Sequence, residues 1–243
     1  MTRDEGADGR LTRLLEARGA LVQHLPLVRH LPPEYAGPLR QAAVCANEFA
    51  WIIFTSARGV NAYAKALREE GLTFAGVTAR IACVGSATAA ALEQAGGNAE
   101  IVARNNGSEG LLAEFAARGG MKGKTVLCPQ ADKARPALGE GLRELGVEVT
   151  SVVAYRTEAL PGGSALVRST READAVLFCS PSATEALRTL TPGERQVVRN
   201  GLHVGSMGPA TSEALRQLGI EPDFEPEVRT FEGLADALAR ALS

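Results

Sequence analysis

The sequence predicts an α/β protein made of two similar halves. Its clearest signal is an internal repeat, in which matching segments lie 123 to 127 residues apart. The matched pairs are Ile53–Ser56 with Leu177–Ser180, Val84–Thr88 with Met207–Thr211, Ser108–Leu111 with Phe231–Leu234, and Leu15–Gly19 with Leu142–Gly146. Solenoid repeats are only ~20–50 residues long, so this period indicates a repeated small domain. Two like domains imply a cleft between them, and we expect a ligand to bind in that cleft.

The second signal is the regular succession of strand-like segments along the chain. Several are continuous apolar runs, which are typical of parallel strands covered on both faces. The predicted strands are Ala20–Leu25, Trp51–Thr55, Arg80–Val84, Glu100–Ala103, Lys124–Cys128, Val147–Ala154, Asp174–Cys179 and Leu202–Met207.

Amphipathic helices are predicted between these strands. Apolar stripes at helical spacing include Val60, Tyr63 and Leu67 in the first half and Leu234 and Leu238 in the second. Each of five glycines follows a helical pattern, at the position where a left-handed residue commonly ends a helix. These glycines are Gly19, Gly71, Gly96, Gly146 and Gly219. The βαβα order therefore favours an open parallel sheet in each half.

Two segments rich in proline or glycine mark candidate hinges, at Leu25–Pro38 and Thr157–Ser164. If the chain crosses between domains at both, residues 1–27 and 158–243 form one discontinuous α/β domain. Residues 35–153 then form the other domain, with linkers at about 28–34 and 154–157. Simple tandem halves are the alternative, and the pattern of residues alone barely separates the two arrangements.

Composition excludes several classes of function. A net charge of −2 gives no basic excess for nucleic acid, and no apolar run is long enough to cross a membrane. The first residues have no apolar core and do not resemble a signal peptide. The cysteines and histidines lack metal-ligand spacing, so we expect no metal site. We expect the thiols to be free, in a reducing cytosol. The cysteines and histidines are Cys45, Cys83, Cys128, Cys179, His24, His30 and His203.

Four repeated turns share one pattern, in which a strand is followed by a small or polar residue and then a helix. They are Thr55–Ala57, Gly85–Thr88, Ser180–Ser182 and Gly208–Thr211. In parallel sheets such turns lie at the carboxyl edge, where open α/β sheets bind ligands. Helix N-termini carry unpaired N–H groups, and several together would bind a polyanion. The alternative is that these residues only cap their own helices.

No cofactor motif accompanies these turns. The chain has no GxGxxG after a strand, no GxxxxGK[ST] and no GxSxG elbow. If the chain is an enzyme, we expect it to work without a cofactor or a covalent nucleophile.

Several stretches together resemble one family. They are Thr2-Arg3 with the helix ending at Leu15–Ala20, Phe54–Val60, Val84–Ala89, Leu142–Val149 running on to Val153–Thr157, Phe178–Ala183 and Met207–Thr211. Each motif is weak alone, but their order and spacing are specific. The chain resembles uroporphyrinogen-III synthase of haem biosynthesis over almost its whole length.

The resemblance implies two flavodoxin-like domains joined by a two-stranded linker, with the N-terminal strand in the C-terminal domain. It implies hydroxymethylbilane as substrate, a linear tetrapyrrole with an acetate and a propionate on every ring. The family's enzyme closes the macrocycle, inverts ring D and loses water, which makes it a carbon–oxygen lyase. We expect a cytoplasmic monomer without cofactor, nucleic-acid or membrane partner.

The resemblance also implies roles for individual residues. Tyr155 matches a tyrosine thought to assist departure of the hydroxyl, and a phenol can donate that hydrogen bond. Its alternative role is a partly buried aromatic at a strand end. The expected substrate-binding residues are Arg3, Ser56, Arg58, Gly85, Ser86, Thr88, Ser180, Ser182, Gly208 and Thr211. For Arg58, a solvated helix start is the alternative.

One departure from the family concerns the N-terminus. Family members usually have an apolar strand before the segment that matches Thr2-Arg3, so we expect that strand to be absent or to lie upstream of Met1. The competing function is a non-catalytic bilobed protein that binds or senses a small polyanion, because fold does not fix function. A two-domain glycosyltransferase is less consistent with the length and with the lack of a nucleotide motif.

Overall fold

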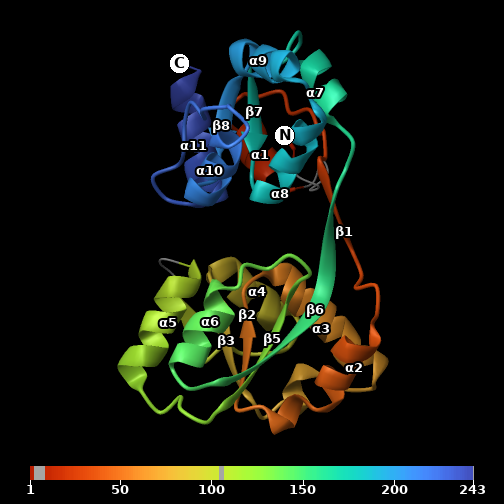
Figure 1. Ribbon diagram of the computed structural model, residues 1–243, viewed down its shortest axis with the longest axis vertical. Helices are drawn as coiled ribbons and strands as arrows, with labels where there is room; N and C mark the ends of the chain where they lie inside the picture. Colours follow the sequence, from red (N-terminus) through yellow and green to blue (C-terminus); the bar gives the residue numbers. More distant parts are fainter. Residues whose placement is uncertain (3–8, 104–106, 243) are drawn as a thin grey trace. The chain divides into compact units, whose positions relative to one another are not determined.

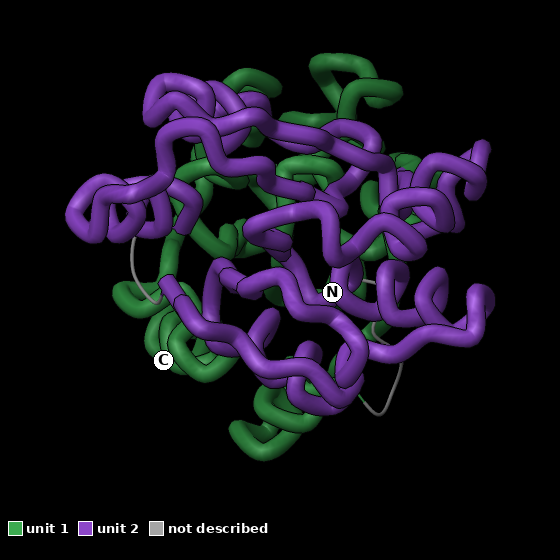
Figure 2. The backbone as a smooth tube through the Cα atoms, turned by 90° about the horizontal axis from the view of Figure 1, so that it is seen from below, with its two compact units in different colours: residues 1–29, 158–243 green, residues 30–157 purple. Residues whose placement is uncertain are grey.

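A computed structural model describes residues 1–2, 9–103 and 107–242. Arg3, one of the expected binding residues, lies outside these ranges. The chain divides into two compact units (Figures 1 and 2). Unit 1 contains Met1–Arg29 and Glu158–Ser243, and unit 2 contains His30–Thr157. Among the described residues, no helix is both long and apolar enough to cross a membrane.

A six-stranded sheet has the order β1-β6-β5-β2-β3-β4 (Figure 1). Its strands are β1 (Val28–Leu31), β2 (Trp51–Phe54), β3 (Arg80–Val84), β4 (Ile101–Ala103), β5 (Thr125–Ala131) and β6 (Glu148–Ala159). The pairs β2–β3, β2–β5, β3–β4 and β5–β6 are parallel. All four residues of β2 are buried, which agrees with the prediction of a strand covered on both faces.

Each face of the sheet in unit 2 packs against helices. Phe54 and Ile52 belong to one core cluster, which includes Tyr63 of α3, and Trp51 and Ile53 belong to a second cluster. Successive side chains of a strand point to opposite faces, so one apolar strand supplies both cores. The helices are α2 (Gly37–Val44), α3 (Ala57–Glu69), α4 (Ser86–Gln94), α5 (Gly107–Arg118) and α6 (Ala137–Glu144), with short 3₁₀ turns η1 (Ala46–Glu48) and η2 (Phe74–Gly76).

The chain passes between the units within β1 and β6, which are neighbouring strands. Leu160 donates its N–H to the Leu27 carbonyl, Arg29 pairs with Glu158, and His30 contacts Thr157. Residue numbers rise along one strand as they fall along the other, so these two strands are antiparallel. The expected two-stranded linker is therefore a paired ribbon. The proline content of the segment around Val28 obscured the strand there.

Unit 1 has a parallel pair of strands, β7 (Ala175–Phe178) and β8 (His203–Ser206). An isolated bridge joins Gly205 to Phe224 beside β8. Two apolar clusters form its core, one of which contains Phe178. Its helices are α1 (Arg10–Glu16), α7 (Gly163–Ser169), α8 (Pro181–Thr184), α9 (Pro192–Gly201), α10 (Pro209–Arg216) and α11 (Phe231–Ala241), with the 3₁₀ turn η3 (Glu185–Thr189).

The strands expected from Trp51 onward are confirmed, with ends that differ by a few residues. All five glycines expected to end helices have positive φ, as predicted. The strand expected over Ala20–Leu25 is wrong, because no regular strand forms there. Among the described residues, only Met1 and Thr2 border this segment on the β7 side, and a strand needs a longer partner.

Candidate functional site

The first candidate site is the carboxyl edge of the sheet in unit 2. Because β2, β3, β4 and β5 are parallel, their carboxyl ends lie at one edge. The helix α3 begins directly after β2, and α4 begins directly after β3. Ser56 is the N-cap of α3, and its side chain accepts a hydrogen bond from the Gly59 N–H at 3.1 Å. Gly85 precedes α4 with φ +85°, a conformation that favours glycine.

The two helix starts of unit 2 present backbone donors. Among the described residues, the N–H groups of Ala57, Ser86 and Ala87 have no hydrogen-bond acceptor. Thr88 differs, because its N–H donates to the Gly85 carbonyl and only 4% of the residue is exposed. An anion at this turn would therefore meet the amides of Ser86 and Ala87 before it met the Thr88 side chain.

Two of the expected site residues, Tyr155 and Ser56, lie side by side in the structure. The two hydroxyl oxygens are 3.2 Å apart, although the residues are 99 positions apart in the chain. β6 carries Tyr155, and β5 separates β6 from β2 in the sheet. Since the Ser56 oxygen already accepts from Gly59, its proton can be donated to the phenol oxygen. The Tyr155 hydroxyl proton is then available to another acceptor.

The close approach of α3 to β5 holds this pair in place. A Cβ atom added to Gly59 would lie 3.0 Å from the Pro129 carbonyl oxygen and 3.4 Å from the Ser56 oxygen. Glycine at this position therefore lets the helix start approach the strand end. Gly59 lies three residues after Ser56, and this spacing could have been recognised in the sequence.

His30 is a neighbour of Tyr155 that sequence reasoning missed. The two rings meet edge to face, with centroids 5.7 Å apart, and His30 Nδ1 lies 3.3 Å from the Thr157 hydroxyl. A lone histidine among scattered histidines gave no motif that could have identified it. The contact arises only because β1 lies beside β6.

A cavity of about 300 Å³ opens beside Tyr155 within unit 2. Its wall is mostly apolar and includes Leu39 and Ala62, and it is also lined by Glu69 and by three basic residues. These are Arg40, Arg58 and Lys65. Such a cavity suits an apolar group that carries carboxylates, although Lys65 already pairs with Glu69 at 3.7 Å.

The matching edge of unit 1 differs in detail. Ser180 is the N-cap of α8, as expected, with Pro181 in the first turn, but its side chain makes no capping hydrogen bond. Helix α8 has four residues, so its terminus is a weaker anion site than that of α3. Ser182 and Ala210 keep N–H groups without an acceptor in the described part of unit 1.

Gly208 precedes α10, and Thr211 repeats the behaviour of Thr88. The Thr211 N–H donates to the Gly208 carbonyl at 2.8 Å, and 3% of the residue is exposed. Next to this turn, Ser212 bonds both to Ser206, with 2.5 Å between the oxygens, and to Glu225. Sequence reasoning missed this buried hydroxyl chain, which fixes α10 against β8.

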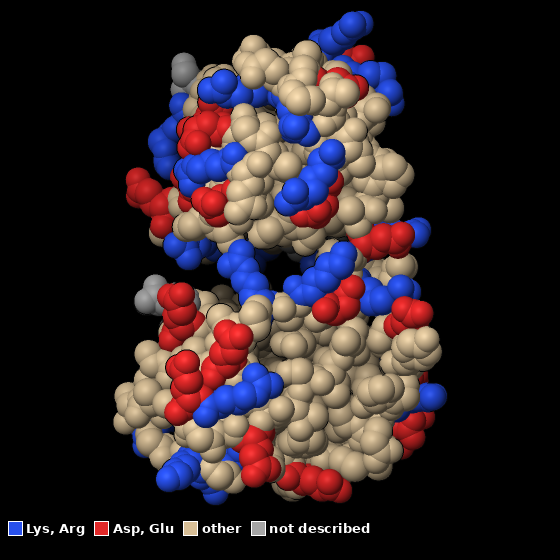
Figure 3. Space-filling model, viewed as in Figure 1, with Lys and Arg blue, Asp and Glu red and all other residues tan. Residues whose placement is uncertain are grey.

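Basic and acidic side chains are mixed on the surface of the described residues. Lys and Arg are interspersed with Asp and Glu on the visible face of each unit (Figure 3). Burial raises the pKa of the Cys83 and Cys128 thiols to about 12, so they pack as neutral apolar groups. All four cysteines are free.

The fold defines a two-unit α/β protein in which helices begin directly after parallel strands in each unit. A family model described as uroporphyrinogen-III synthase HemD matches residues 9–236. The chain therefore belongs to the uroporphyrinogen-III synthase family.

Individual relatives agree with this assignment. The chain is 26% identical to the uroporphyrinogen-III synthase of Synechococcus elongatus, over 98% of this chain and 92% of the relative. It is 28% identical to the chloroplastic uroporphyrinogen-III synthase of Oryza sativa subsp. japonica, over 100% of this chain and 80% of the relative. A crystal structure of a mutant uroporphyrinogen III synthase from Thermus thermophilus shares the fold. Its TM-score is 0.69 at 22% identity, over 97% of this chain and 95% of that chain.

Proposed function

We propose that the chain is a uroporphyrinogen-III synthase that cyclises hydroxymethylbilane with inversion of ring D and loss of water, a carbon–oxygen lyase of haem biosynthesis. The observation that carries the proposal is the family match over residues 9–236, which includes the described helix starts of both units and Tyr155. We further propose a cytoplasmic monomer that works without a cofactor.

Binding of the substrate is proposed to rest on many weak contacts. The acetate and propionate groups would meet the amides of Ser86 and Ala87 in unit 2 and that of Ala210 in unit 1. Each helix terminus contributes about 0.3–1 kcal/mol per charge, so several termini are needed. Arg58, which lines the cavity beside Tyr155, would add a bidentate contact to one carboxylate. The expected cleft between the units and the role of Arg3 stay predictions.

Tyr155 is the proposed catalytic residue. As the bond between the terminal carbon and its hydroxyl breaks, the Tyr155 O–H would donate its proton to the departing oxygen, which leaves as water. The phenolate would regain a proton from the pyrrole carbon that loses its hydrogen when the ring closes. The contact with Ser56 supports this role, because a hydrogen bond donated by the Ser56 O–H would leave the Tyr155 O–H free to face substrate. No strong acid is required, since the hydroxyl also leaves unaided during closure without inversion.

Steering between the two closures requires little energy. A hundredfold preference for one route corresponds to about 2.7 kcal/mol of differential transition-state stabilisation. Holding both ends of a flexible chain in one geometry can supply that amount.

The test is product analysis. Hydroxymethylbilane is supplied to the purified protein, and the uroporphyrin isomers are separated after oxidation. Isomer III in excess supports the proposal, and isomer I alone would contradict it. The competing hypothesis of a non-catalytic binding protein predicts tight binding of the substrate without turnover, and the names of the relatives do not favour it.

A further inference from the structure

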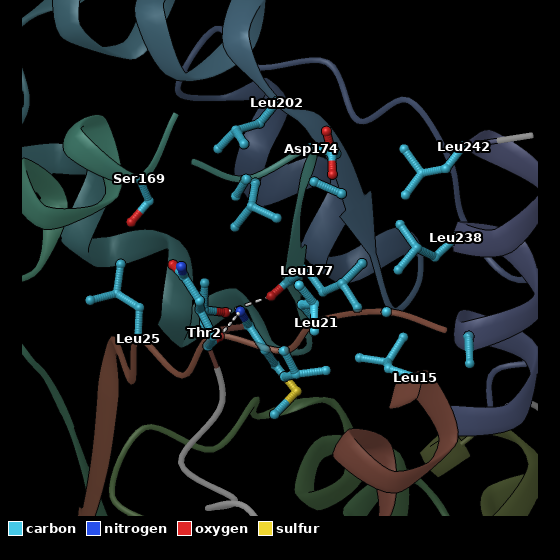
Figure 4. Close-up of a pocket in the computed structure, with 18 of the residues that line it drawn as sticks. Thr2, Leu15, Leu21, Leu25, Ser169, Asp174, Leu177, Leu202, Leu238 and Leu242 are labelled. Carbon is cyan, nitrogen blue, oxygen red and sulfur yellow. Dashed lines mark hydrogen bonds between the residues drawn. The ribbon is translucent and has the colours of Figure 1, made fainter. Parts of the chain in front are cut away.

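Unit 1 contains a cavity of about 620 Å³ beside β7, lined by residues such as Leu15, Leu202 and Leu238 (Figure 4). None of its described lining residues is an expected site residue. In unit 2, by contrast, Tyr155 and Arg58 both line the cavity described above. The groups that hold Tyr155 in place therefore bear on the proposed function more directly than the larger cavity does.

An irregularity in the pairing of β5 with β6 lies directly before Tyr155. Gln130 pairs with Val153. The next residue, Ala131, pairs with Tyr155, so the register shifts by one residue. Ala154 is therefore an extra residue on β6, which makes this point a β-bulge. Bulges bend a strand and change the direction in which its side chains point.

The bulge puts two successive side chains of β6 against one core. In a regular strand, successive side chains point to opposite faces of the sheet. Ala154 and Tyr155 instead both pack against the apolar cluster that contains Tyr63 of α3. Ser56 is the N-cap of α3, and its hydroxyl oxygen lies 3.2 Å from that of Tyr155. The bulge thus turns the phenol toward the start of α3.

Asp132 holds β6 at this bulge by two hydrogen bonds. Its N–H donates to the Tyr155 carbonyl at 3.0 Å, and its Oδ1 accepts from the Thr157 N–H at 3.0 Å. In a regular parallel ladder, the main-chain carbonyl of the first residue would accept the second bond. Here the chain turns after β5, and the carboxylate takes the place of that carbonyl. The two bonds fix the backbone from the Tyr155 carbonyl to the Thr157 amide.

Thr157 connects Asp132 to the other side of the phenol. The Thr157 hydroxyl lies 3.3 Å from His30 Nδ1, and the His30 ring meets that of Tyr155 edge to face. Among the described residues, the Thr157 amide is the only hydrogen-bond or ion-pair partner of the Asp132 carboxylate, which is otherwise exposed. Asp132 therefore acts on the backbone of Tyr155 and, through Thr157, on the histidine beside its ring.

We propose that Asp132 is a positioning residue, whose carboxylate holds the bulge of β6 in the form that directs the Tyr155 hydroxyl toward Ser56. This inference rests on the proposed function, in which the Tyr155 hydroxyl protonates the departing oxygen. Asp132 acts through the backbone of β6, so its removal should displace the phenol without removing any group that binds substrate.

The first test compares the turnover of hydroxymethylbilane by three variants. Asp132→Ala removes the acceptor, and Asp132→Asn keeps an oxygen at the same position. Glu148→Ala is the control, because it removes an exposed carboxylate from the start of the same strand. Asp132→Ala is expected to lower kcat about tenfold and to change KM less than about twofold, because misplacing a catalytic group acts mainly on the transition state. Asp132→Asn should keep at least about half of kcat, and Glu148→Ala should change neither constant.

The second test reads the position of the phenol ring without catalysis. The chain has three tyrosines, Tyr35, Tyr63 and Tyr155, which are replaced by 3-fluorotyrosine and followed by ¹⁹F NMR. Tyr155→Phe identifies the Tyr155 resonance. In Asp132→Ala this resonance should move toward its position in the urea-unfolded protein, whereas the resonance of the buried Tyr63 should stay in place and show that unit 2 is folded. Asp132→Asn and Glu148→Ala should leave all three resonances in place.

The two tests separate this proposal from the proposed function. An unchanged Tyr155 resonance in Asp132→Ala would overturn the proposal, and so would a shifted resonance with unchanged kcat. If the unaltered protein makes only isomer I, the proposed function fails, and the ¹⁹F comparison still decides whether Asp132 holds Tyr155. If Asp132→Ala does not fold, Asp132→Glu takes its place in both tests with the same expected results, because it displaces the carboxylate by one methylene.

Discussion

The two units share a repeated sequence but differ in how far their sheets are built. In unit 2, β2 has a paired strand on each side and apolar clusters on each face. In unit 1, β7 pairs with β8 on one edge, and the other edge borders a cavity. The repeated motifs place a helix start after a strand in both units. The difference teaches that such motifs specify strand–helix turns, and that the number of strands depends on segments outside the repeat.

The largest expected effect comes from truncating the matched phenylalanines Phe54 in β2 and Phe178 in β7. Both are fully buried, and each change to alanine should lower the stability of its own unit by about 3–5 kcal/mol. The single tryptophan, Trp51, belongs to unit 2, so its fluorescence reports that unit. Phe54→Ala should shift the fluorescence transition in denaturant. Phe178→Ala should leave the fluorescence transition in place and shift only the part of the circular-dichroism transition that belongs to unit 1. Equal shifts of the fluorescence transition in the two variants would show that the units unfold together.

The next effect concerns Tyr155, which makes unit 2 the expected centre of the chemistry. Tyr155→Phe removes one hydrogen bond to a charged transition state, worth about 1.5–3 kcal/mol, so kcat should fall about 10- to 100-fold. The ring contact with His30 is retained, and the stability read from Trp51 should change by no more than about 1 kcal/mol. Full turnover in this variant would remove Tyr155 from the mechanism and leave the fold untouched.

A smaller effect is expected on the stability of unit 2 at alkaline pH. Cys83 and Cys128 are in unit 2, and burial raises the pKa of each thiol from 9.0 to about 12. The unfolded chain releases these protons first, so the stabilisation is complete below pH 9 and is lost as pH rises toward 12. From pH 8 to 10, unit 2 should lose about 1 kcal/mol per thiol. A Cys83→Val, Cys128→Val variant, read by Trp51 fluorescence, should lack this loss, and an equal loss would show that other groups cause it.

The smallest expected effect is the loss of stability when either of the two repeated serines, Ser56 or Ser180, is changed to alanine. Ser56 caps α3 through a hydrogen bond, whereas Ser180 makes no such bond to α8. Ser56→Ala should therefore cost about 1 kcal/mol of stability. Ser180→Ala should cost less than about 0.5 kcal/mol, measured by thermal unfolding of both variants. Equal losses would mean that the serines have the same role in both units.

Local patterns explain most of what could be predicted. Continuous apolar runs such as Trp51–Phe54 predicted buried parallel strands, and Gly71 and Gly146 predicted helix ends. The failures have physical causes as well. The segment around Val28 forms a strand despite nearby prolines, because β6 provides an edge. Ala20–Leu25 was expected to be a strand, but within the part of the chain that the structure describes it borders only Met1 and Thr2 on the β7 side.

The sequence by itself determined the repeat, the order of strands and helices, and the positions of the turns at which the helices begin. These depend on interactions within a few residues, such as side-chain periodicity and capping. Only the tertiary structure decided that Ser56 meets Tyr155, that His30 lies against the same ring, and that the Thr88 side chain is buried. Such contacts join residues far apart in the chain, and they follow from the order of strands in the sheet, which no local pattern encodes.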